Sequence, residues 1–287
     1  MKILSFHLLL ETEWNRVLYG DELSLEDIDA VQTADGVILP QGCKENIYRT
    51  ACKYCSNIFP NYDARFSHPG KTGQSLLFFA QGAATPRTCV VDNIDHQLHC
   101  PSSSFTFPFV FKSAWGGEGK RVFLVHSETE LQKCLELARC WERENVGGYL
   151  FQEHIPTGGR SLRVAVIGAD MYPYWRVQEG GDGFYTNLAK GATIDTASYP
   201  DLMAKACLRL QPFCHATGIN LAGFDFIFNE KDKDPEPLFL EINYGFRTRG
   251  LGGPDSYLML LERAVREWKE NLSDHKHRIF AQTGRPI

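Results

Sequence analysis

The chain has 287 residues with 43% hydrophobic and 12% aromatic content, which is enough for about two domains with sizeable cores. Its formal net charge is −5 and its Lys and Arg residues are spread along the chain, which argues against nucleic acid as a main partner. No apolar run is long enough to cross a membrane, and charged residues follow the short apolar start too soon for a signal peptide.

The first part of the chain alternates short apolar segments with amphipathic ones. The predicted elements are a strand at 3–9, a helix from Ser24, a strand at 36–39, a helix at 44–55 and a strand at 58–60. Asp27, three residues after Ser24, supplies a capping signal for the first helix. Strands that alternate with helices are typical of a parallel sheet, so a small α/β domain is predicted here.

Gly70, Lys71 and Thr72 resemble the end of a phosphate-binding P-loop, and a helix through Phe79 follows them. The P-loop motif needs a glycine five residues before Gly70, where Arg65 stands, and a buried strand ahead of it. The sequence therefore does not contain a P-loop, although Lys71 remains a candidate for contacting a phosphate.

A glycine-rich hairpin is predicted in the middle of the chain. A strand at 107–112 ends in Lys112 and runs into Gly116, Gly117 and Gly119, before a second strand at 121–125. Glycines let the backbone approach a ligand closely, and a lysine at the strand end adds a positive charge for phosphate. An ordinary hairpin tip is the alternative, and the dinucleotide fingerprint is excluded because these glycines lie between two strands.

Further strands and helices are expected towards the C-terminus. They are a helix at 127–142, strands at 149–155, 162–168 and 171–177, a helix at 200–217 stopped by Gly218, and a helix at 255–271 before a mobile tail from Ser273. Arg163 and Arg176 lie on the predicted strands, and for each of them a surface ion pair is the alternative to a binding role.

The stretch from Gly223 to Asn243 is predicted to be an antiparallel hairpin, because apolar residues alternate at both ends and a Pro-rich turn separates them. Closed symmetrically about Lys233, it places Asp225 opposite Glu241, with Asn243 on the same face. Opposed carboxylates repel unless a cation lies between them, and oxygen ligands suit Mg²⁺. The alternative is a hairpin whose second face is partly solvated.

The same register defines the other face of the hairpin. It pairs Phe228 with Leu238 and leaves Ile227 and Phe239 on the face of the carboxylates. The expected apolar face consists of Phe224, Phe226, Phe228, Leu238, Leu240 and Ile242. A one-residue slip would destroy this sorting, so the apolar face supports the register.

Nine cysteines form no compact framework, and several lie in apolar helical contexts. We therefore expect reduced thiols in a cytoplasmic protein. Cys52 and Cys55 form a CxxC, but no second pair with zinc-ligand spacing follows. Incidental cysteines on a packed helix are favoured over a zinc or redox site, and any role of this pair is left open.

The order of these features resembles the ATP-grasp superfamily, most closely its ribosomal-protein glutamyl ligase and glutathione synthetase-like branch, over about residues 61–253. The resemblance implies a Rossmann-like α/β domain at 1–88, an α+β lid subdomain with the glycine-rich flap at 89–155, and an α+β subdomain with the magnesium site at 156–287. The two α+β subdomains would sandwich ATP.

The resemblance also implies residue roles. The nucleotide contacts would be Lys71, Lys112, Gly116, Gly117, Gly119, Gln152, Glu153, His154 and Ile155. The catalytic residues would be Arg163, Arg176, Asn187 and Lys190. Two Mg²⁺ ions, with Mn²⁺ as an alternative, would be held by Asp225, Glu241 and Asn243.

The activity implied is an ATP- and Mg²⁺-dependent carboxylate–amine ligase, which makes an amide or peptide bond through an acylphosphate and releases ADP and phosphate. Its substrates would be a carboxylate and an amine, either small molecules or peptides, and a homo-oligomer is left open. A small-molecule kinase and a non-catalytic ATP-binding regulatory module are the alternatives. Ser161 stands where related ligases often have Asp, and Arg247 and Arg249 follow the metal motif in place of Pro-Gly, which suggests an acidic substrate.

Overall fold

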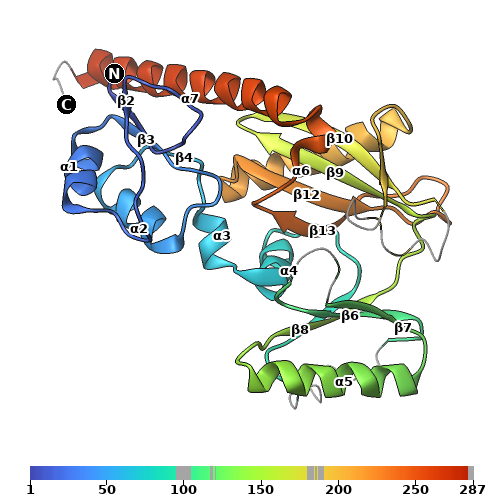
Figure 1. Ribbon diagram of the computed structural model, residues 1–287. Helices are drawn as coiled ribbons and strands as arrows, with labels where there is room; N and C mark the ends of the chain where they lie inside the picture. The colour runs from blue at the N-terminus through green and yellow to red at the C-terminus, as the bar shows by residue number, and fades with distance from the viewer. Residues whose placement is uncertain are drawn as a thin grey trace.

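The computed structural model describes residues 1–94, 105–116, 119, 121–179, 184, 186 and 191–283, and of residues 274–283 the backbone alone. Three sheets form within these residues, one at the N-terminal end, one in the middle of the chain and one towards the C-terminus (Figure 1). No helix within these ranges is long and apolar enough to cross a membrane.

The N-terminal sheet is parallel, with the strand order β2-β1-β3-β4. Its elements are β1 (Ile3–Ser5), β2 (Trp14–Asn15), α1 (Leu25–Thr33), β3 (Gly36–Ile38), α2 (Glu45–Tyr54) and β4 (Ile58–Phe59). The Ser24 hydroxyl accepts from the Asp27 backbone N–H, and the Asp27 carboxylate accepts from the Ser24 backbone N–H, as the predicted capping signal requires. The predicted α/β class is confirmed at this end of the chain.

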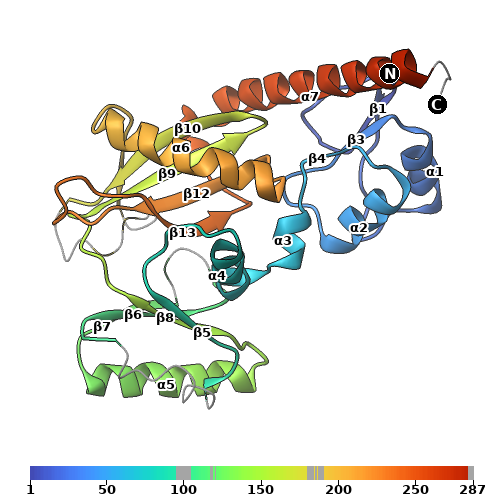
Figure 2. The same ribbon diagram turned by 180° about the vertical axis from the view of Figure 1, so that it is seen from behind.

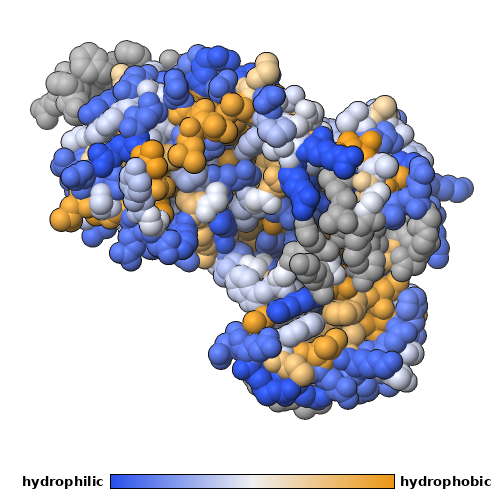
Figure 3. All heavy atoms as spheres, in the orientation of Figure 1, coloured by the Kyte–Doolittle hydropathy of each residue, from blue (hydrophilic) through white to orange (hydrophobic). Residues whose placement is uncertain are grey.

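The middle sheet is antiparallel, with the order β5-β8-β6-β7. The helices before it are α3 (Asp63–Ser67) and α4 (Gly70–Ala80), and its own elements are β5 (Thr88–Val91), β6 (Phe109–Ser113), β7 (Val122–Val125), α5 (Glu128–Arg143) and β8 (Tyr149–Glu153). Phe109, Phe111 and Phe151 pack on one face with α5, so the alternate residues Val110 and Lys112 occupy the other face. Figure 3 shows apolar surface over β6 and β7 on the side that faces the C-terminal sheet.

The C-terminal sheet is also antiparallel, with the order β11-β10-β9-β12-β13. The elements are β9 (Arg160–Ile167), β10 (Asp170–Val177), β11 (Thr193–Asp195), α6 (Pro200–Thr217), β12 (Leu221–Ile227), β13 (Leu238–Asn243), the 3-10 helix η4 (Thr248–Leu251) and α7 (Pro254–Thr283). Helix α6 covers one face of this sheet (Figure 2).

Strand β9 is buried on both faces, and its two sets of alternate residues have different neighbours. Leu162 and Val164 belong to the core that includes α6, whereas Ala165 and Ile167 pack with residues of α7. Arg163 shares the face of Ala165 and Ile167 by alternation, and it lies at the cavity described below. Strand periodicity thus separates the α6 core from the face that carries the charged residues.

The hairpin of β12 and β13 confirms part of the predicted register. Asp225 lies opposite Glu241, as expected. The register then shifts by one residue, so that Ile227 pairs with Leu238, and the predicted pairing of Phe228 with Leu238 was wrong. The extra residue in β13 is a β-bulge, which the apolar pattern did not reveal.

The bulge changes which side chains of β13 face the core. Phe239, predicted on the face of the carboxylates, is buried with its ring centroid 4.5 Å from that of Phe226. Leu240, predicted on the apolar face, instead lines the cavity beside Glu241. One inserted residue reverses the side-chain alternation between the bulge and the turn, which is why both assignments were wrong.

Helix α7 joins the first and third sheets (Figures 1 and 2). It continues to Thr283, so the predicted helix end near residue 271 was wrong, and the mobility expected from Ser273 stays a prediction. The sequence contains no Gly or Pro between Pro254 and Gly284, so nothing in it ends the helix earlier. Trp268 contacts the Phe59 ring of β4 with a centroid distance of 5.8 Å.

Most described cysteines have free thiols, as expected, but Cys89 is disulfide-bonded, which corrects the expectation of reduced thiols throughout. Burial raises the pKa of the Cys43 thiol to about 11, so this thiol stays protonated at neutral pH. No group of three or more His, Cys, Asp or Glu side chains able to hold a metal occurs in the described part of the chain. Cys52 and Cys55 therefore have no metal-binding cluster around them there.

Gly168 tests the contact of α7 with the C-terminal sheet. It has a φ of +68°, and a Cβ there would lie 2.7 Å from the Cβ of Ala264 in α7. We expect Gly168→Ala to lower the free energy of unfolding by about 2–4 kcal/mol, from backbone strain plus overpacking. Gly82→Ala is the matched control, because Gly82 has a φ of +63° with no atom near a Cβ, and it should lose only about 1 kcal/mol. Equal losses in urea unfolding would show that the α7 contact contributes nothing.

Candidate active site

A cavity of about 360 Å³ lies between the middle and C-terminal sheets, with residues of both in its lining. This volume is in the range of small-molecule sites. Its charged lining residues are Lys71, Lys112, Arg160, Arg163, Arg176, Arg247, Glu153, Asp225 and Glu241. Cations outnumber carboxylates in this set, so the cavity favours an anionic ligand.

Lys112 lies at the end of the cavity formed by the middle sheet. Strand alternation turns it away from α5, and its Nζ donates to Gln152 Oε1 at 2.6 Å. Gln152 Nε2 in turn donates to Thr88 Oγ1 at 2.8 Å, which fixes the orientation of the amide. Burial lowers the pKa of Lys112 to about 8, although Glu241 and Asp225 partly oppose this shift.

Lys71 connects α4, the glycine-rich segment and the hairpin of β12 and β13. Its Nζ lies 3.1 Å from Glu241 Oε1 and donates to the Gly116 carbonyl at 2.9 Å. Its backbone N–H donates to the Ala114 carbonyl at 2.9 Å, which satisfies one free donor at the start of α4. Gly119 also lines the cavity. The predicted flap and Lys71 therefore meet at the same end of the site.

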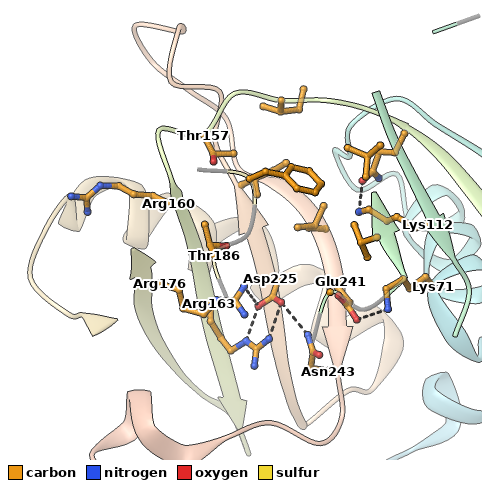
Figure 4. A pocket seen from close by; sticks show the side chains of 18 of the residues that line it. Lys71, Lys112, Thr157, Arg160, Arg163, Arg176, Thr186, Asp225, Glu241 and Asn243 are labelled. Atoms are coloured by element: carbon orange, nitrogen blue, oxygen red, sulfur yellow. Dashed lines mark hydrogen bonds and ion pairs between the residues drawn. The ribbon is translucent and has the colours of Figure 1, made fainter. Parts of the chain in front are cut away.

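Asp225 is the centre of the opposite end, and four N–H donors surround its carboxylate (Figure 4). Arg163 binds it with two parallel contacts, Nε to Oδ1 at 2.7 Å and Nη2 to Oδ2 at 2.8 Å. Arg176 Nη2 lies 3.0 Å from Oδ1, and Asn243 Nδ2 donates to Oδ2 at 3.1 Å. A carboxylate has about four lone-pair positions, so all the acceptor capacity of Asp225 is used.

The charges at this end do not balance. Burial alone would raise the pKa of Asp225, but Arg163 and Arg176 outweigh it and lower the pKa, so the carboxylate is ionised. Arg176 also donates to the neutral Ser161 hydroxyl, from Nε at 3.2 Å and Nη2 at 3.0 Å, and Thr186 Oγ1 donates to Ser161 at 2.6 Å. Two guanidiniums thus share one carboxylate in a nearly buried cluster, which leaves one positive charge for an anionic ligand to neutralise.

The residues present fit a hard divalent cation, mainly through Glu241 and Asn243. Because an ionised carboxylate only accepts hydrogen bonds, Asn243 must turn its NH₂ group to Asp225, which leaves its Oδ1 for another partner. The Glu241 side chain is 30% exposed and only its Oε1 lies near Lys71. Carboxylate and amide oxygens suit Mg²⁺. Asp225 would add a ligand only by releasing one of its N–H contacts.

The remaining wall of the cavity is apolar, with aromatic rings at its edge. Its aliphatic lining residues are Val110, Val122, Ile155, Ile227 and Leu240. Glu153 ends β8 at this wall, and the His154 and Phe184 rings lie 5.9 Å apart. An apolar wall next to a carboxylate and a cationic end is suited to a flat base, a sugar and phosphates in that order.

Most of the predicted site residues meet at this one cavity. Its lining includes Lys71, Lys112, Gly119, Gln152, Glu153, His154, Ile155, Arg163, Arg176, Asp225, Glu241, Asn243 and Arg247. Gly116 reaches the site through its bond to Lys71, whereas Arg249 lies exposed on η4 outside the lining. Gly117, Asn187 and Lys190 lie outside the described residues. The roles assigned to these residues stay predictions.

Several residues that line the cavity were not predicted from the sequence, among them Tyr174, Arg160 and Thr186. Tyr174 was recognisable, because it is two residues before Arg176 on a strand and therefore on the same face. Its ring fills the space beside Gly250, where a Cβ would lie 2.2 Å from the ring. Arg160 gave no such signal, since it precedes the strand pattern and pairs with Asp195 at 3.3 Å.

Comparisons with known proteins agree on the fold. A family model described as the RimK-like ATP-grasp domain matches residues 73–252. The chain is similar in structure to D-alanine–D-alanine ligase from Bacillus anthracis, with a TM-score of 0.60 and 14% identity over 94% of this chain and 98% of that one. It is also similar to the ADP complex of an N5-carboxyaminoimidazole ribonucleotide synthetase, with a TM-score of 0.60 and 11% identity over 83% of this chain and 60% of that one.

Among curated proteins, an uncharacterized protein of Mycoplasma pneumoniae, the MG012 homolog, is 29% identical over 140 residues, 48% of this chain and 44% of that protein. The chain spans less than half the length of the curated relatives it matches. These matches therefore cover only part of each relative, and the activities of the whole relatives are not inferred for this chain.

The lowered pKa of Lys112 predicts a pH-dependent affinity for polyanions. Its Nζ is charged below about pH 8 and loses the charge as the pH rises through that value. We expect inorganic tripolyphosphate to bind about tenfold more weakly at pH 9 than at pH 7 in calorimetry, as the charged fraction falls. The Lys112→Gln variant gives the pH dependence that comes from the titration of tripolyphosphate itself. Lys231→Gln, on an exposed loop, should show the same pH dependence as the unaltered protein. Parallel profiles for the Lys112→Gln and unaltered proteins would contradict the assignment.

Proposed function

This chain belongs to the RimK-like ATP-grasp domain family, whose members are ATP-dependent carboxylate–amine ligases, and we propose that it joins a carboxylate to an amine. The observation that best supports this proposal is that charged residues of the middle sheet and of the C-terminal sheet face each other across one cavity. Lys112 comes from the middle sheet, and Glu241 and Asn243 come from the C-terminal sheet. Such a site surrounds a polyphosphate with cations on one side and metal ligands on the other.

The nucleotide would lie along the cavity from the apolar wall to the arginines. Its base would contact the aliphatic side chains, with Glu153 near the ribose, as the family resemblance implies. Lys112 and Lys71 would bind the phosphates, because each places an ammonium group at the end of the cavity next to the middle sheet. The Gly116 carbonyl accepts a hydrogen bond from Lys71 Nζ, and phosphate oxygens would take its place. The glycine-rich segment would then cover the phosphates and exclude water.

A Mg²⁺ ion would be held by Glu241 and Asn243 together with phosphate oxygens, and Asp225 would join if a guanidinium left it. Bound there, the ion supplies neutralisation of charge on the transferred phosphoryl group. The ion pair of Lys71 with Glu241, at 3.1 Å, would keep this carboxylate turned toward the phosphates. The bulge before Glu241 puts Leu240 and Glu241 on the cavity side together.

The arginine end would bind the carboxylate substrate, because Arg163 and Arg176 carry one more positive charge than Asp225 neutralises. A carboxylate oxygen would attack the terminal phosphorus of ATP, form an O–P bond and expel ADP. The amine would then attack the acyl carbon of this acylphosphate, form the C–N bond, expel phosphate and release a proton. Arg163 and Arg176 would stabilise the charge on the phosphoryl oxygens in both steps.

Trapping of the acylphosphate tests the ligase. With ATP, Mg²⁺ and a panel of amino acids, peptides and other carboxylates, we expect ADP to accumulate with some acid and hydroxylamine to yield the corresponding hydroxamate. A stable phosphorylated product that hydroxylamine does not capture would instead establish the kinase alternative. Tight ATP binding without ADP release across the panel would establish a non-catalytic module.

Glu241 is the residue whose loss should separate binding from chemistry. We expect Glu241→Gln to lower kcat for ADP release by about 10²–10³-fold, because the amide cannot supply the negative charge that a divalent cation needs. Glu136→Gln, at an exposed position of α5, is the matched control and should leave kcat unchanged. Normal turnover in Glu241→Gln would remove the hairpin carboxylate from the mechanism.

A further inference from the structure

The side chain of Gln74 in α4 binds the backbone of Ile242 in β13 as a neighbouring strand would. Gln74 Nε2 donates to the Ile242 carbonyl at 2.8 Å, and the Ile242 N–H donates to Gln74 Oε1 at 2.9 Å. Both polar groups of the amide are used, and both polar backbone groups of one residue are satisfied. Only a side chain with a donor and an acceptor side by side makes this pair of bonds, and among the amino acids Asn and Gln provide it.

Ile242 occupies a special place in the site. It lies between Glu241 and Asn243, the two residues whose oxygens fit a cation. Strand β13 is at the edge of the C-terminal sheet, so the backbone groups of Ile242 that point away from β12 have no strand to pair with. The Ile242 side chain is buried in the core, which turns Glu241 and Asn243 to the cavity by alternation.

The same helix also carries Lys71. Lys71 and Gln74 are three residues apart in α4 and therefore lie on one side of the helix. Gln74 bonds to Ile242 while Lys71 Nζ reaches Glu241, the adjacent residue of β13. The two hydrogen bonds of Gln74 thus fix the position of Lys71 relative to Glu241.

The hairpin has contacts other than those with Gln74 to hold it in place. Strand β13 pairs with β12 on both sides of the bulge, and the N–H of Phe239 donates to the Ala84 carbonyl further along the same edge. Phe78 of α4 packs against Phe239 with a centroid distance of 5.4 Å, which keeps the helix on the strand. Loss of the Gln74 amide therefore removes local orientation and leaves the core contacts in place.

We propose that Gln74 is a positioning residue that orients Glu241 and Asn243 for a metal–nucleotide complex. The proposal rests on the proposed function, since it requires that the site bind a nucleotide with a divalent cation. Gln74 contacts neither ligand; it acts through the backbone of Ile242. Its loss should therefore weaken the part of nucleotide affinity that the metal adds, and leave the metal-free part nearly intact.

Calorimetry with a non-hydrolysable ATP analogue tests this, with the full chain in Mg²⁺ and again in EDTA. We expect Gln74→Met, which keeps the length of the side chain, and Gln74→Ala to weaken binding in Mg²⁺ by about 10-fold or more, as loss of an outer partner of a metal ligand does. In EDTA the same variants should lose less than about 3-fold. The matched control is Gln132→Met on α5, whose amide donates to Glu128 in the same helix, and it should change neither affinity.

Two outcomes would overturn the proposal in distinguishable ways. Equal losses of affinity in Mg²⁺ and in EDTA, or no loss in either, would show that Gln74 has only a structural role or none. Absence of analogue binding by the unaltered protein in Mg²⁺ would refute the proposed function itself, and the proposal with it. Circular dichroism of both variants verifies that they are folded before binding is compared.

Discussion

The carboxylate of Asp225 is the interaction on which the candidate site depends. It is 5% exposed, and it holds Arg163, Arg176 and Asn243 in one cluster between two strands and a hairpin. A buried guanidinium needs a paired carboxylate, since removal of one partner of a buried ion pair destabilises a protein by about 3–5 kcal/mol. The position of Asp225 in β12, directly beside Arg163 of β9, provides that pairing by strand register alone.

The alternation of strand residues then assigns the rest of the site. In both antiparallel sheets one face packs on its own helix, α5 or α6. The other face of the middle sheet turns to the cavity, and that of the C-terminal sheet is divided between the cavity and the contact with α7. Lys112 alternates with phenylalanines and Arg163 alternates with aliphatic residues, so charged groups reach the cavity without entering either core. Helix α4 lies between the two sheets and contacts both, which fixes the distance across which they face each other (Figure 2).

Local patterns in the sequence predicted the parts of the site that depend on local spacing. The alternation around Asp225 and Glu241 was sufficient for their pairing, because a slip of one residue would have exposed the apolar face. The bulge was not predictable, since Leu238, Phe239 and Leu240 are all apolar and satisfy either face. The Gln74–Ile242 bonds join positions 168 residues apart, and no local pattern reports a contact of that range.

The distribution of charge narrows what the cavity accommodates. Positive charge lies at two separated ends, Lys71 with Lys112 and Arg163 with Arg176, and Glu241 and Asn243 offer oxygens between them (Figure 4). A singly charged ligand would neutralise one end and leave the other with an unbalanced buried cation. A ligand with anionic groups at both ends and a metal between them would neutralise all three regions. Under the proposed function, a polyphosphate beside a carboxylate has that distribution, so the charges of the described residues fit this pair of ligands better than a nucleotide alone.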